Sequence, residues 1–525
     1  MHAKPLSHFQ FLTLDLFAFA ANHCQLQAHV GDISRWWCLG LQGRSLVSDC
    51  DLCDEFVGCD FGDDRLSKRA LKMADVFENN PGRSIPSAFV TRAEWEACYR
   101  FFDNQAVTPQ ALVEPHIQAS RERVKVLDIA LLVQDTTEID LTRPKQQVRG
   151  AGPMGSDSRR GAFFHPLIAF NTDGVPLGLV GIQSWTRDAI SHDTPKEKHK
   201  KRETTPIEEK ESYRWLVGLQ QAKETAITCP QTTCICTGDS ESDIYELYGL
   251  AHQLREKHPN LQLLVRAGQD RATSADDLWK NVARAAPLIA TQTIYIRARQ
   301  AKVSVSKSLR SKSRKARHVD VQIRACTVEV LRPDHLTGQP KKLKFNVVLV
   351  EETNSPADED PVSWMLVTTL PIDTEQQIQA IIRYYCIRWQ IEVFFRTLKS
   401  GCRIEYRRFE TLDRVLNCLA MFSVVAWRVM YVTYLGRTCP DLDCETVFEP
   451  SEWKSVYAVL RRPIPSNGRP KLQEVVRAIA LLGGFVDRRN DIPGTQTVWT
   501  GLQRCYDLSN AWNVFGPGAK KFSSV

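Results

Sequence analysis

The sequence has no paired cysteine spacing that would indicate a disulfide framework, although sixteen of its 525 residues are cysteine. The tightest group is Cys50, Cys53 and Cys59, and it lacks the second pair of cysteines or histidines that a zinc site needs. Scattered thiols in a chain of this length are typical of a reducing compartment. The class of small, disulfide-stapled secreted domains is therefore excluded, and a zinc module is not indicated.

Long hydrophobic runs are also lacking. The N-terminal stretch "FQFLTLDLFAFAA" is interrupted by Asp15, is too short to cross a bilayer, and has neither the basic segment nor the cleavage site of a signal peptide. We therefore expect a cytoplasmic protein with no membrane partner. Residues 1–52 show no helix caps and no clear periodicity, so they stay unassigned. We expect residues 1–50 to be a dispensable extension, as would follow from a start codon assigned too far upstream.

A large net charge is absent as well. The formal charge is +7 at pH 7, and 43% of the residues are hydrophobic and 25% charged, as in an ordinary globular protein. The length allows two to four domains. Positive charge is concentrated in "KEKHKKR" (196–202) and "KVSVSKSLRSKSRKARH" (302–318). Such runs are most often solvated loops, but they also permit a surface that binds phosphates.

Residues 60–120 have the pattern of a small helical module. Thr91 and Glu94 form a capping-box pair, and Thr108 stands before Pro109 as an N-cap before a proline in the first helical turn. One face of the first helix carries three cations at i, i+4 and i+7, namely Arg65, Arg69 and Lys72. We expect either a solvated face or a face that contacts DNA, on a module that is separable from the rest of the fold.

The middle of the chain changes to strand patterns. "VLDIALLVQD" and "TTCICTGD" are apolar runs that each end in an acid, Asp135 and Asp239. Two further strand runs flank the turn sequence "NTDG", which predicts a hairpin. Short β-like runs dominate residues 267–370, and an apolar helix follows. This order predicts an α/β fold with a mixed sheet of ribonuclease H type and a β-rich insertion.

The segment "YYCIRWQIEVFFRTLK" (384–399) is apolar around most of its circumference when placed on one helix, so we expect a buried helix with a single polar stripe. The stripe consists of Tyr385, Arg388, Glu392 and Lys399, with Arg396 beside it. Glu392 could simply pair with Arg388 or Arg396 within the helix. That pairing leaves a cation over, so the second interpretation is a carboxylate that binds a metal beside cations that bind phosphates.

Three carboxylates, Asp135, Asp239 and Glu392, are expected to meet, because active sites in open α/β sheets lie at the ends of the strands. Acids that converge in a buried site cannot all stay ionised unless cations hold them. Oxygen ligands favour two Mg²⁺ ions about 3.5–4 Å apart, with Mn²⁺ as a substitute, which would activate a water and stabilise the leaving oxygen of a phosphodiester. The alternative for each aspartate is an ordinary turn or N-cap residue.

The segment 384–399 resembles the Tyr-x2-Arg-x3-Glu-x6-Lys signature of the insertion-sequence-four family of DDE transposases, which includes the transposon-five transposase. Every spacing of that signature is kept. "LLVQDTTEID" is similar to the family segment around the first catalytic aspartate, and "CTGDSESDIYEL" is similar to the second, in the form Asp-x3-Asp-Ile. The similarity runs from about residue 53 nearly to the C-terminus.

The resemblance implies a ribonuclease H-like core with a β-rich insertion, preceded by a helical DNA-binding domain and followed by a helical region for dimerisation. The expected parts are 53–120 (DNA binding), 121–266 and 371–435 (core), 267–370 (insertion) and 436–525 (dimerisation).

The resemblance also implies roles for single residues. The catalytic metal ligands would be Asp135, Asp239 and Glu392. The residues that hold phosphates of the transposon end would be Tyr385, Arg388 and Lys399, which Arg396 would join on charge and position alone. Trp364 is similar to a tryptophan that stacks a flipped base in relatives, although it could be an ordinary strand aromatic. Arg266 matches a basic family position, but "AGQD" stands where relatives often have a lysine.

These features together indicate a cut-and-paste DNA transposase that acts as a homodimer on the double-stranded DNA of its own element ends and of the target. The resemblance implies a hairpin intermediate, and a bacterial protein that lies on the nucleoid when bound to DNA. Two alternatives stay open. One is a DNA-binding copy without catalysis, and the other is a nuclease on the same fold, which would cut DNA without joining 3′ ends to a target.

Overall fold

The computed structural model describes residues 52–156, 158–188, 194–296, 313–465, 468–489 and 491–517. These residues form two compact units. The smaller unit comprises the described residues within 290–323 and 350–363, and the larger unit contains the others. Nearly all of the predicted extension 1–52, and most of the basic run 302–318, lie outside the described residues.

The larger unit begins with helices, as predicted. They are the 3-10 turn Leu52–Phe56 and the helices α3 (Asp64–Asn79), α4 (Ile85–Ala88), α5 (Arg92–Phe102) and α6 (Pro109–Lys125). The predicted caps are confirmed. Thr91 Oγ1 accepts from the Glu94 amide at 3.4 Å, the Glu94 carboxylate accepts from the Thr91 amide at 3.2 Å, and Thr108 Oγ1 accepts from the amide three residues on. These bonds satisfy amides that the first helical turn leaves without partners.

This N-terminal module is packed into the larger unit, and whether the core folds without it stays a prediction. The buried carboxylate of Glu55 accepts from Arg123 at 2.7 Å, and Arg428 of the long helix α13 (Leu412–Thr438) donates to Glu78 at 2.9 Å. Asn417 of α13 donates to a backbone carbonyl at the end of α5 at 3.0 Å. Removing the module would take a hydrogen-bond partner from each of these buried groups, and such a loss costs more than the hydrogen bond contributes.

A mixed sheet follows, as the sequence predicts. Its strands are β1 (Ile129–Gln134), β2 (Thr137–Asp140), β3 (Gly152–Pro153), β4 (Arg160–Phe170), β5 (Pro176–Trp185), β6 (Thr233–Gly238), β7 (Leu261–Arg266), β8 (Leu288–Ile296), β9 (Arg317–Leu331), β10 (Lys342–Glu352) and β11 (Ser363–Thr368). The order within the larger unit is β2-β4-β1-β6-β7-β11-β10-β9, and in the smaller unit β8 pairs with β9. β1, β6 and β7 are parallel neighbours, so their carboxyl ends lie side by side.

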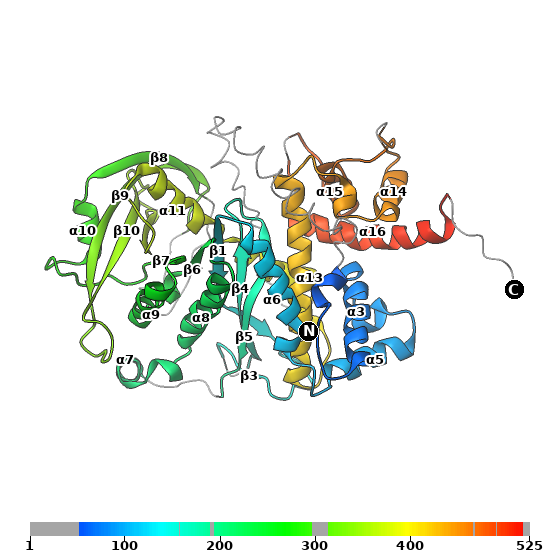
Figure 1. The fold of residues 1–525 in the computed structure, drawn as a ribbon, viewed down its shortest axis with the longest axis horizontal. Helices are drawn as coiled ribbons and strands as arrows, with labels where there is room; N and C mark the ends of the chain where they lie inside the picture. The colour runs from blue at the N-terminus through cyan, green and yellow to red at the C-terminus, as the bar shows by residue number, and fades with distance from the viewer. Residues whose placement is uncertain are drawn as a thin grey trace, which may run out of the picture. The chain divides into compact units, whose positions relative to one another are not determined.

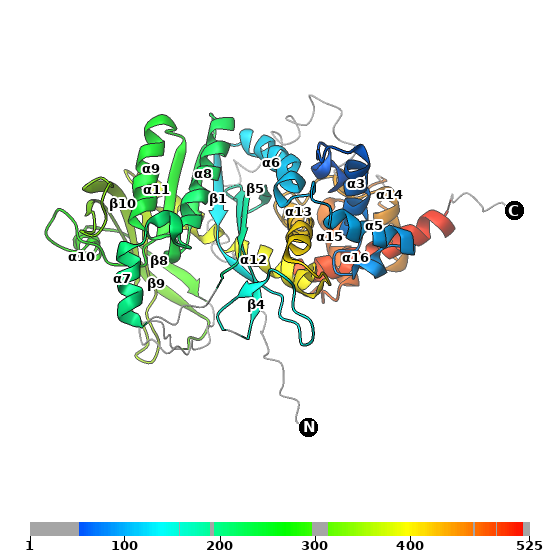
Figure 2. The ribbon, with the colours of Figure 1, turned by 90° about the horizontal axis from the view of Figure 1, so that it is seen from below.

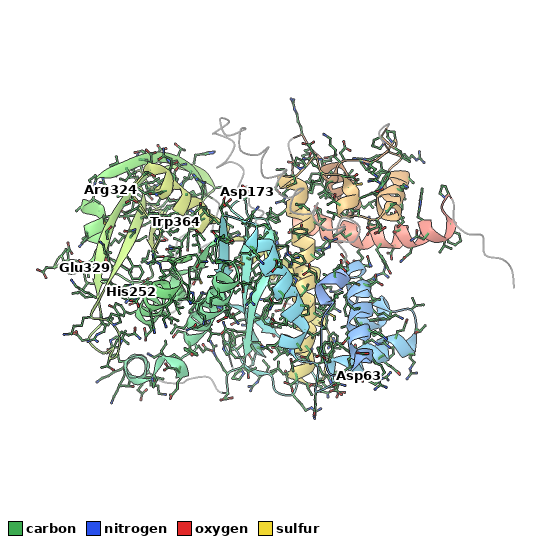
Figure 3. The ribbon with its side chains drawn as sticks, in the orientation of Figure 1. Asp63, Asp173, His252, Arg324, Glu329 and Trp364 are labelled. Carbon is green, nitrogen blue, oxygen red and sulfur yellow. The ribbon has the colours of Figure 1, made fainter. Side chains whose placement is uncertain are left out.

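The turn sequence "NTDG" joins β4 and β5 in an antiparallel hairpin, which confirms the prediction. Asn171 Oδ1 accepts from the amides of Asp173 and Val175 at 3.0 and 2.9 Å. Gly174 adopts a φ of +81°, a conformation that costs a glycine little. Asp173 is labelled at this turn in Figure 3.

Four helices lie between the strands in sequence. They are α7 (Pro195–Thr204), α8 (Tyr213–Thr228), α9 (Tyr245–Lys257) and α10 (Trp279–Ala285). α8 packs against β4, β5 and β6, and its neighbour α9 packs against β7 (Figure 2). The first turn of α8 lies at the carboxyl end of β1, because Arg214 there reaches Thr136.

The segment 384–399 is not the single regular helix that the sequence predicts. It consists of α11 (Glu375–Ile387), α12 (Gln390–Arg396) and a π-helical turn, Thr397–Gly401. Between α11 and α12 the hydrogen bonds tighten to i→i−3, since the amide of Arg388 donates to the carbonyl of Tyr385 at 3.1 Å. Short 3-10 and π interruptions recur at functional sites because they change where side chains point around the helix.

Helix α13 is the central helix of the larger unit. It contacts β5 on one side and α3, α5, α15 (Leu472–Leu482) and α16 (Thr495–Phe515) on the other (Figure 1). α14 (Pro450–Val459) packs against α15 and α16, and α15 ends at the predicted glycine pair. Within the described part of the chain, α13 alone is long and apolar enough to cross a membrane, and 94% of its most apolar window is buried inside the protein.

Candidate active site

Asp135 and Asp239 directly follow two parallel neighbouring strands. Val133 of β1 pairs with Thr237 of β6, so the same register carried two residues further sets Asp135 alongside Asp239. Asp135 is buried, with 9% exposure, and Asp239 is half-buried. Each aspartate also accepts one local backbone bond, Asp135 from the Thr136 amide at 2.7 Å and Asp239 from the Glu241 amide at 2.8 Å. The turn-residue interpretation therefore holds for one oxygen of each, and the second oxygen of Asp135 has a partner of another kind, Arg388.

Arg388 connects the interrupted helix to the strand ends. Its Nη1 donates to Asp135 Oδ2 at 2.8 Å, and both side chains are only 12% exposed. Arg388 thus pairs with Asp135, which directly follows β1, and not with Glu392 of its own segment as one interpretation of the sequence predicts. Burial alone would lower the pKa of Arg388, but Tyr385 and the carboxylates of Asp135, Asp239 and Glu392 raise it. The guanidinium of Arg388 therefore contacts Asp135 and is influenced by the charges of all three predicted catalytic acids.

The three carboxylates repel one another in a buried place. Burial raises the pKa of Asp135 to about 7; Arg388 lowers it, and the charges of Asp239 and Glu392 raise it further. Burial likewise raises the pKa of Glu392; Arg388 and Lys399 oppose that rise, while Asp239 adds to it. The charges of Asp239 and Glu392 therefore act on Asp135, and the charge of Asp239 acts on Glu392, so the three predicted acids form one group of neighbouring charges.

Tyr385, Arg266 and Lys399 surround this group. Tyr385 is buried, and its ring centroid lies 5.7 Å from the Arg388 guanidinium. Burial raises the pKa of Tyr385, and Arg388 and Arg266 partly offset that rise, so Arg266 lies near the phenol. Lys399, in the π-helical turn, has its Nζ 3.8 Å from Glu405 Oε1. These side chains form a cationic and phenolic border beside the acids.

Trp364 shares a sheet face with Arg266. β11 runs antiparallel to β7, and Leu366 stands opposite Arg266. Side chains alternate along a strand, so Trp364 projects to the same face as Leu366 and Arg266. Trp364 is half-buried on β11, where Figure 3 labels it. This position is compatible with both predicted roles, a strand aromatic and a surface on which a base can stack.

The structure does not bring Arg396 to the group. Its Nη2 lies 3.4 Å from Thr495 Oγ1, at the start of α16, and burial lowers its pKa. The expectation that Arg396 lies beside Glu392 is wrong, because its side chain extends from α12 toward the C-terminal helices.

The three cations of the predicted face of α3 differ in their exposure to solvent. Arg65 pairs with Asp63, which Figure 3 labels, at 2.8 Å, and Lys72 pairs with Glu94 of α5. Both cations are exposed, and exposed pairs contribute only about 0–1 kcal/mol, so a phosphate can compete for them. Arg69 is half-buried. The structure therefore leaves two of the three cations available on the surface.

The chain around the acids suits a hard divalent cation. Burial and neighbouring carboxylates raise the pKa of Asp135 and of Glu392, and such carboxylates supply the oxygen ligands that Mg²⁺ prefers and negative charge that it would neutralise. In the described ranges, however, no three acidic, histidine or cysteine side chains are already arranged around one ion position. The Arg388–Asp135 ion pair gives a physical reason, because the guanidinium occupies an oxygen that a metal would need.

The pKa of Asp135 predicts how metal binding depends on pH. A carboxyl with a pKa of about 7 is mostly protonated at pH 6 and mostly ionised at pH 8, and a metal binds the ionised form. We expect Mg²⁺ affinity to rise between pH 6 and pH 8, with close to one proton released per Asp135 ligated at the lower pH. Calorimetry in buffers of different ionisation enthalpy measures both quantities, and an affinity that is flat over this range would contradict the expectation.

Two positions that the sequence did not single out also lie at the strand ends. Arg214, at the start of α8, donates to Thr136 Oγ1 at 2.7 Å and to Glu241 Oε2 at 2.7 Å, beside the two aspartates. His165 of β4 is fully buried and contacts Thr136 from the opposite side at 2.8 Å. In the sequence, Arg214 lies in a stretch that is typical of a charged, solvated helix. Two features could have indicated these positions: the tryptophan that follows Arg214, and the occurrence of a histidine, His165, within an apolar strand.

The chain matches three family models. Residues 52–107 match the Transposase DNA-binding model, residues 219–426 the Transposase DDE domain and residues 424–516 the Transposase Tn5 dimerisation domain. The fold, the acids at the strand ends and these matches define a DDE transposase, an enzyme that cuts and joins DNA. More closely, the chain is a Tn5-like DDE transposase, which confirms the resemblance seen in its sequence. DNA and a second copy of the chain are its partners, and the family generally uses divalent metal ions.

Among solved structures the chain is similar to the cryo-EM structure of a piggyBac transposase synaptic complex with hairpin DNA. The similarity has 10% identity and a TM-score of 0.33, and it covers 86% of this chain and 76% of that one.

Proposed function

We propose that this transposase cuts the ends of its own element and joins the freed 3′ ends to target DNA, at a site formed by Asp135, Asp239 and Glu392 on a ribonuclease H-like core. The observation that carries the proposal is the meeting of two acids, at the ends of parallel neighbours β1 and β6, with a helix that contributes Glu392 and Arg388. The protein acts on DNA in the cytoplasm.

The three acids would hold two Mg²⁺ ions, for which Mn²⁺ can substitute. When bound, these ions supply activation of a water or hydroxyl and stabilisation of the leaving oxygen. The side chains around the acids would align the DNA phosphates with these ions. Arg388 can hold a phosphate with two parallel hydrogen bonds once it leaves Asp135, and its Nε has no hydrogen-bond partner among the described residues. Tyr385 and Lys399 flank it and would hold neighbouring phosphates.

Cleavage would proceed through a hairpin, in which the first 3′-hydroxyl attacks the opposite strand. The strand geometry supports this finer proposal at one point. Trp364 and Arg266 share a face at the β7–β11 pair, so a base turned out of the helix could stack on Trp364 while Arg266 neutralises a nearby phosphate.

The other parts of the chain would present DNA and a second subunit. Residues 53–120 would bind the element ends, 121–266 and 371–435 would form the core, and 267–370 would be its insertion. Residues 436–525 would pair two subunits on DNA. The matches at 52–107 and 424–516 support the first and last of these assignments.

Replacing both exposed cations of α3, Arg65→Ala with Lys72→Ala, should weaken binding to the element ends and reduce its salt dependence. The slope of log affinity against log salt falls by about 0.9 for each phosphate that the protein no longer neutralises. Stability should change little, since both side chains are in exposed ion pairs. Fluorescence anisotropy from 50 to 200 mM salt measures the slope, and an unchanged slope would remove this face from the DNA-binding surface. Arg100→Ala with Lys125→Ala, on α5 and α6, is the control.

The function is tested with the full chain, Mg²⁺ and a duplex that carries the element's terminal sequence, together with a supercoiled target. We expect cleavage at the end followed by covalent joining of the 3′ strand to the target. Cleavage without joining would favour a nuclease, and specific binding without cleavage would favour a copy that has lost catalysis.

A further inference from the structure

We propose that Arg214 is a positioning residue that holds the loops of the two strand-end aspartates in register, through a directed chain of hydrogen bonds with Thr136, His165 and Gln134. This inference rests on the proposed metal site. It assigns a task to a part of the protein that lies outside the acids and outside the phosphate-binding residues of the helix.

Arg214 bridges the two catalytic loops. Its Nε donates to Thr136 Oγ1 at 2.7 Å, and Thr136 is the residue after Asp135. Its Nη2 donates to Glu241 Oε2 at 2.7 Å, and the Glu241 amide is the one that donates to Asp239. The Arg214 side chain is 12% exposed and Glu241 is 65% exposed, so the bond to Thr136 is the more shielded arm of this fork. One guanidinium therefore fixes the residues that orient both aspartates.

The donor directions follow from chemistry. Arginine has no acceptor, so Thr136 Oγ1 must accept from Arg214, and its hydroxyl proton is then free to donate to His165 Nδ1, 2.8 Å away. His165 is thereby fixed as the tautomer that carries its proton on Nε2, which lies 3.0 Å from Gln134 Oε1. Burial lowers the pKa of His165 well below its usual range, and the Arg214 charge lowers it further, so the ring is neutral.

The chain of hydrogen bonds continues from His165 through Gln134 and ends at Cys236 of β6. Gln134, the last residue of β1, donates from Nε2 to Cys236 Sγ of β6 at 3.2 Å. Gly218 of α8 leaves room for this amide, because a Cβ there would lie 1.9 Å from Gln134 Oε1. Glycine is less favourable than alanine inside a helix, so the close approach of Gln134 gives this glycine a structural reason. The network thus reaches from α8 through β1 and β4 to β6.

The aromatic surroundings hold Arg214 in this place. Its guanidinium carbon lies 5.7 Å from the ring centroid of Trp185 and 5.3 Å from that of Trp215. Rings at these distances stabilise a cation without competing for its N–H groups. The N–H groups remain free to hold Thr136, Glu241 and the carbonyl of Glu211.

The test uses Arg214→Lys, which keeps the charge but cannot reproduce the fork, and Thr136→Val, which removes the hydroxyl without changing charge. Partners outside the ligand shell typically change metal affinity or activity about 10–100-fold. We expect each variant to weaken Mg²⁺ binding, measured by calorimetry without DNA, about 10-fold. The Mg²⁺ concentration for half-maximal single-turnover cleavage should rise equally, while end binding and melting temperature stay near wild type.

The double variant distinguishes one network from two separate effects. If Arg214 acts through Thr136, Arg214→Lys with Thr136→Val should be little worse than the more impaired single variant. Arg187→Lys is the matched control, because Arg187 also pairs with Glu211 and lies over an aromatic ring but contacts neither aspartate loop. It should leave Mg²⁺ affinity unchanged.

Unchanged Mg²⁺ affinity in Thr136→Val, additive losses in the double variant, or a loss of end binding alone in Arg214→Lys would each overturn the proposal. If Arg214→Lys fails to fold, Thr136→Val alone decides. Failure of the proposed function is a separate result, since it appears as wild-type protein that does not cut and join the element ends.

Discussion

Asp135→Asn, Asp239→Asn and Glu392→Gln should each reduce cleavage of the element end by at least about 1000-fold. Metal-assisted stabilisation of developing charge is worth several kcal/mol, and each 1.36 kcal/mol is a factor of ten in rate. The amides are close in size to the acids they replace, and the three acids repel one another in the metal-free protein. Folding should therefore be preserved, and end binding should change little. Gel-based single-turnover cleavage and a binding assay on the same preparations check both expectations.

The control is Glu375→Gln, an exposed acid in the first turn of α11, which should cut at the wild-type rate. Asp135→Asn should also remove the rise of Mg²⁺ affinity between pH 6 and pH 8. A variant of the three acids that still nicks at nearly the wild-type rate would exclude that residue from the site.

Arg388→Lys should fold and bind the element ends but lose about 100-fold in hairpin and strand-transfer yield. Lysine keeps the charge near Asp135, but it cannot hold a phosphate through two parallel hydrogen bonds. A displacement of about 1 Å at the reacting bond can cost about 100-fold in rate. Melting temperature and single-turnover cleavage, measured together, separate alignment of the phosphate from simple neutralisation of Asp135.

Arg383→Lys, an exposed arginine on the same helix, is the matched control for Arg388. It should change neither the melting temperature nor the cleavage rate. If Arg388→Lys lowers the melting temperature while the folded protein cuts normally, Arg388 serves only to neutralise the buried acids, and its proposed phosphate contact is wrong.

Much of the fold follows from local sequence. The apolar runs that end in Asp135 and Asp239, the caps at Thr91 and Thr108, and the hairpin turn at residues 171–174 appear where they are predicted, because each depends on a few neighbouring residues. The proximity of Asp135 to Asp239 was also predictable in outline, since parallel neighbours place their carboxyl ends together. The parallel pairing itself is a long-range choice that only the structure shows.

The interactions across the chain were not predictable from periodicity. Arg388 pairs with Asp135 rather than with Glu392, because the 3-10 interruption between α11 and α12 changes the angular order of the segment. Arg396 reaches Thr495, a partner 99 residues later that periodicity does not indicate. Arg214 appears solvated in sequence, but its partners come from loops 78 and 27 residues away. The N-terminal module appears separable because its buried partners, such as Arg428, lie more than 300 residues later.

The most direct test is the anomalous scattering of Mn²⁺ in crystals of the full chain bound to element-end DNA. We expect Mn²⁺ bound by carboxylate oxygens of Asp135, Asp239 and Glu392, with the Arg388 guanidinium moved from Asp135 to a phosphate of the DNA. Mn²⁺ bound elsewhere, or Arg388 still paired with Asp135 while the DNA is cut, would contradict the assignment of these acids as the catalytic metal site.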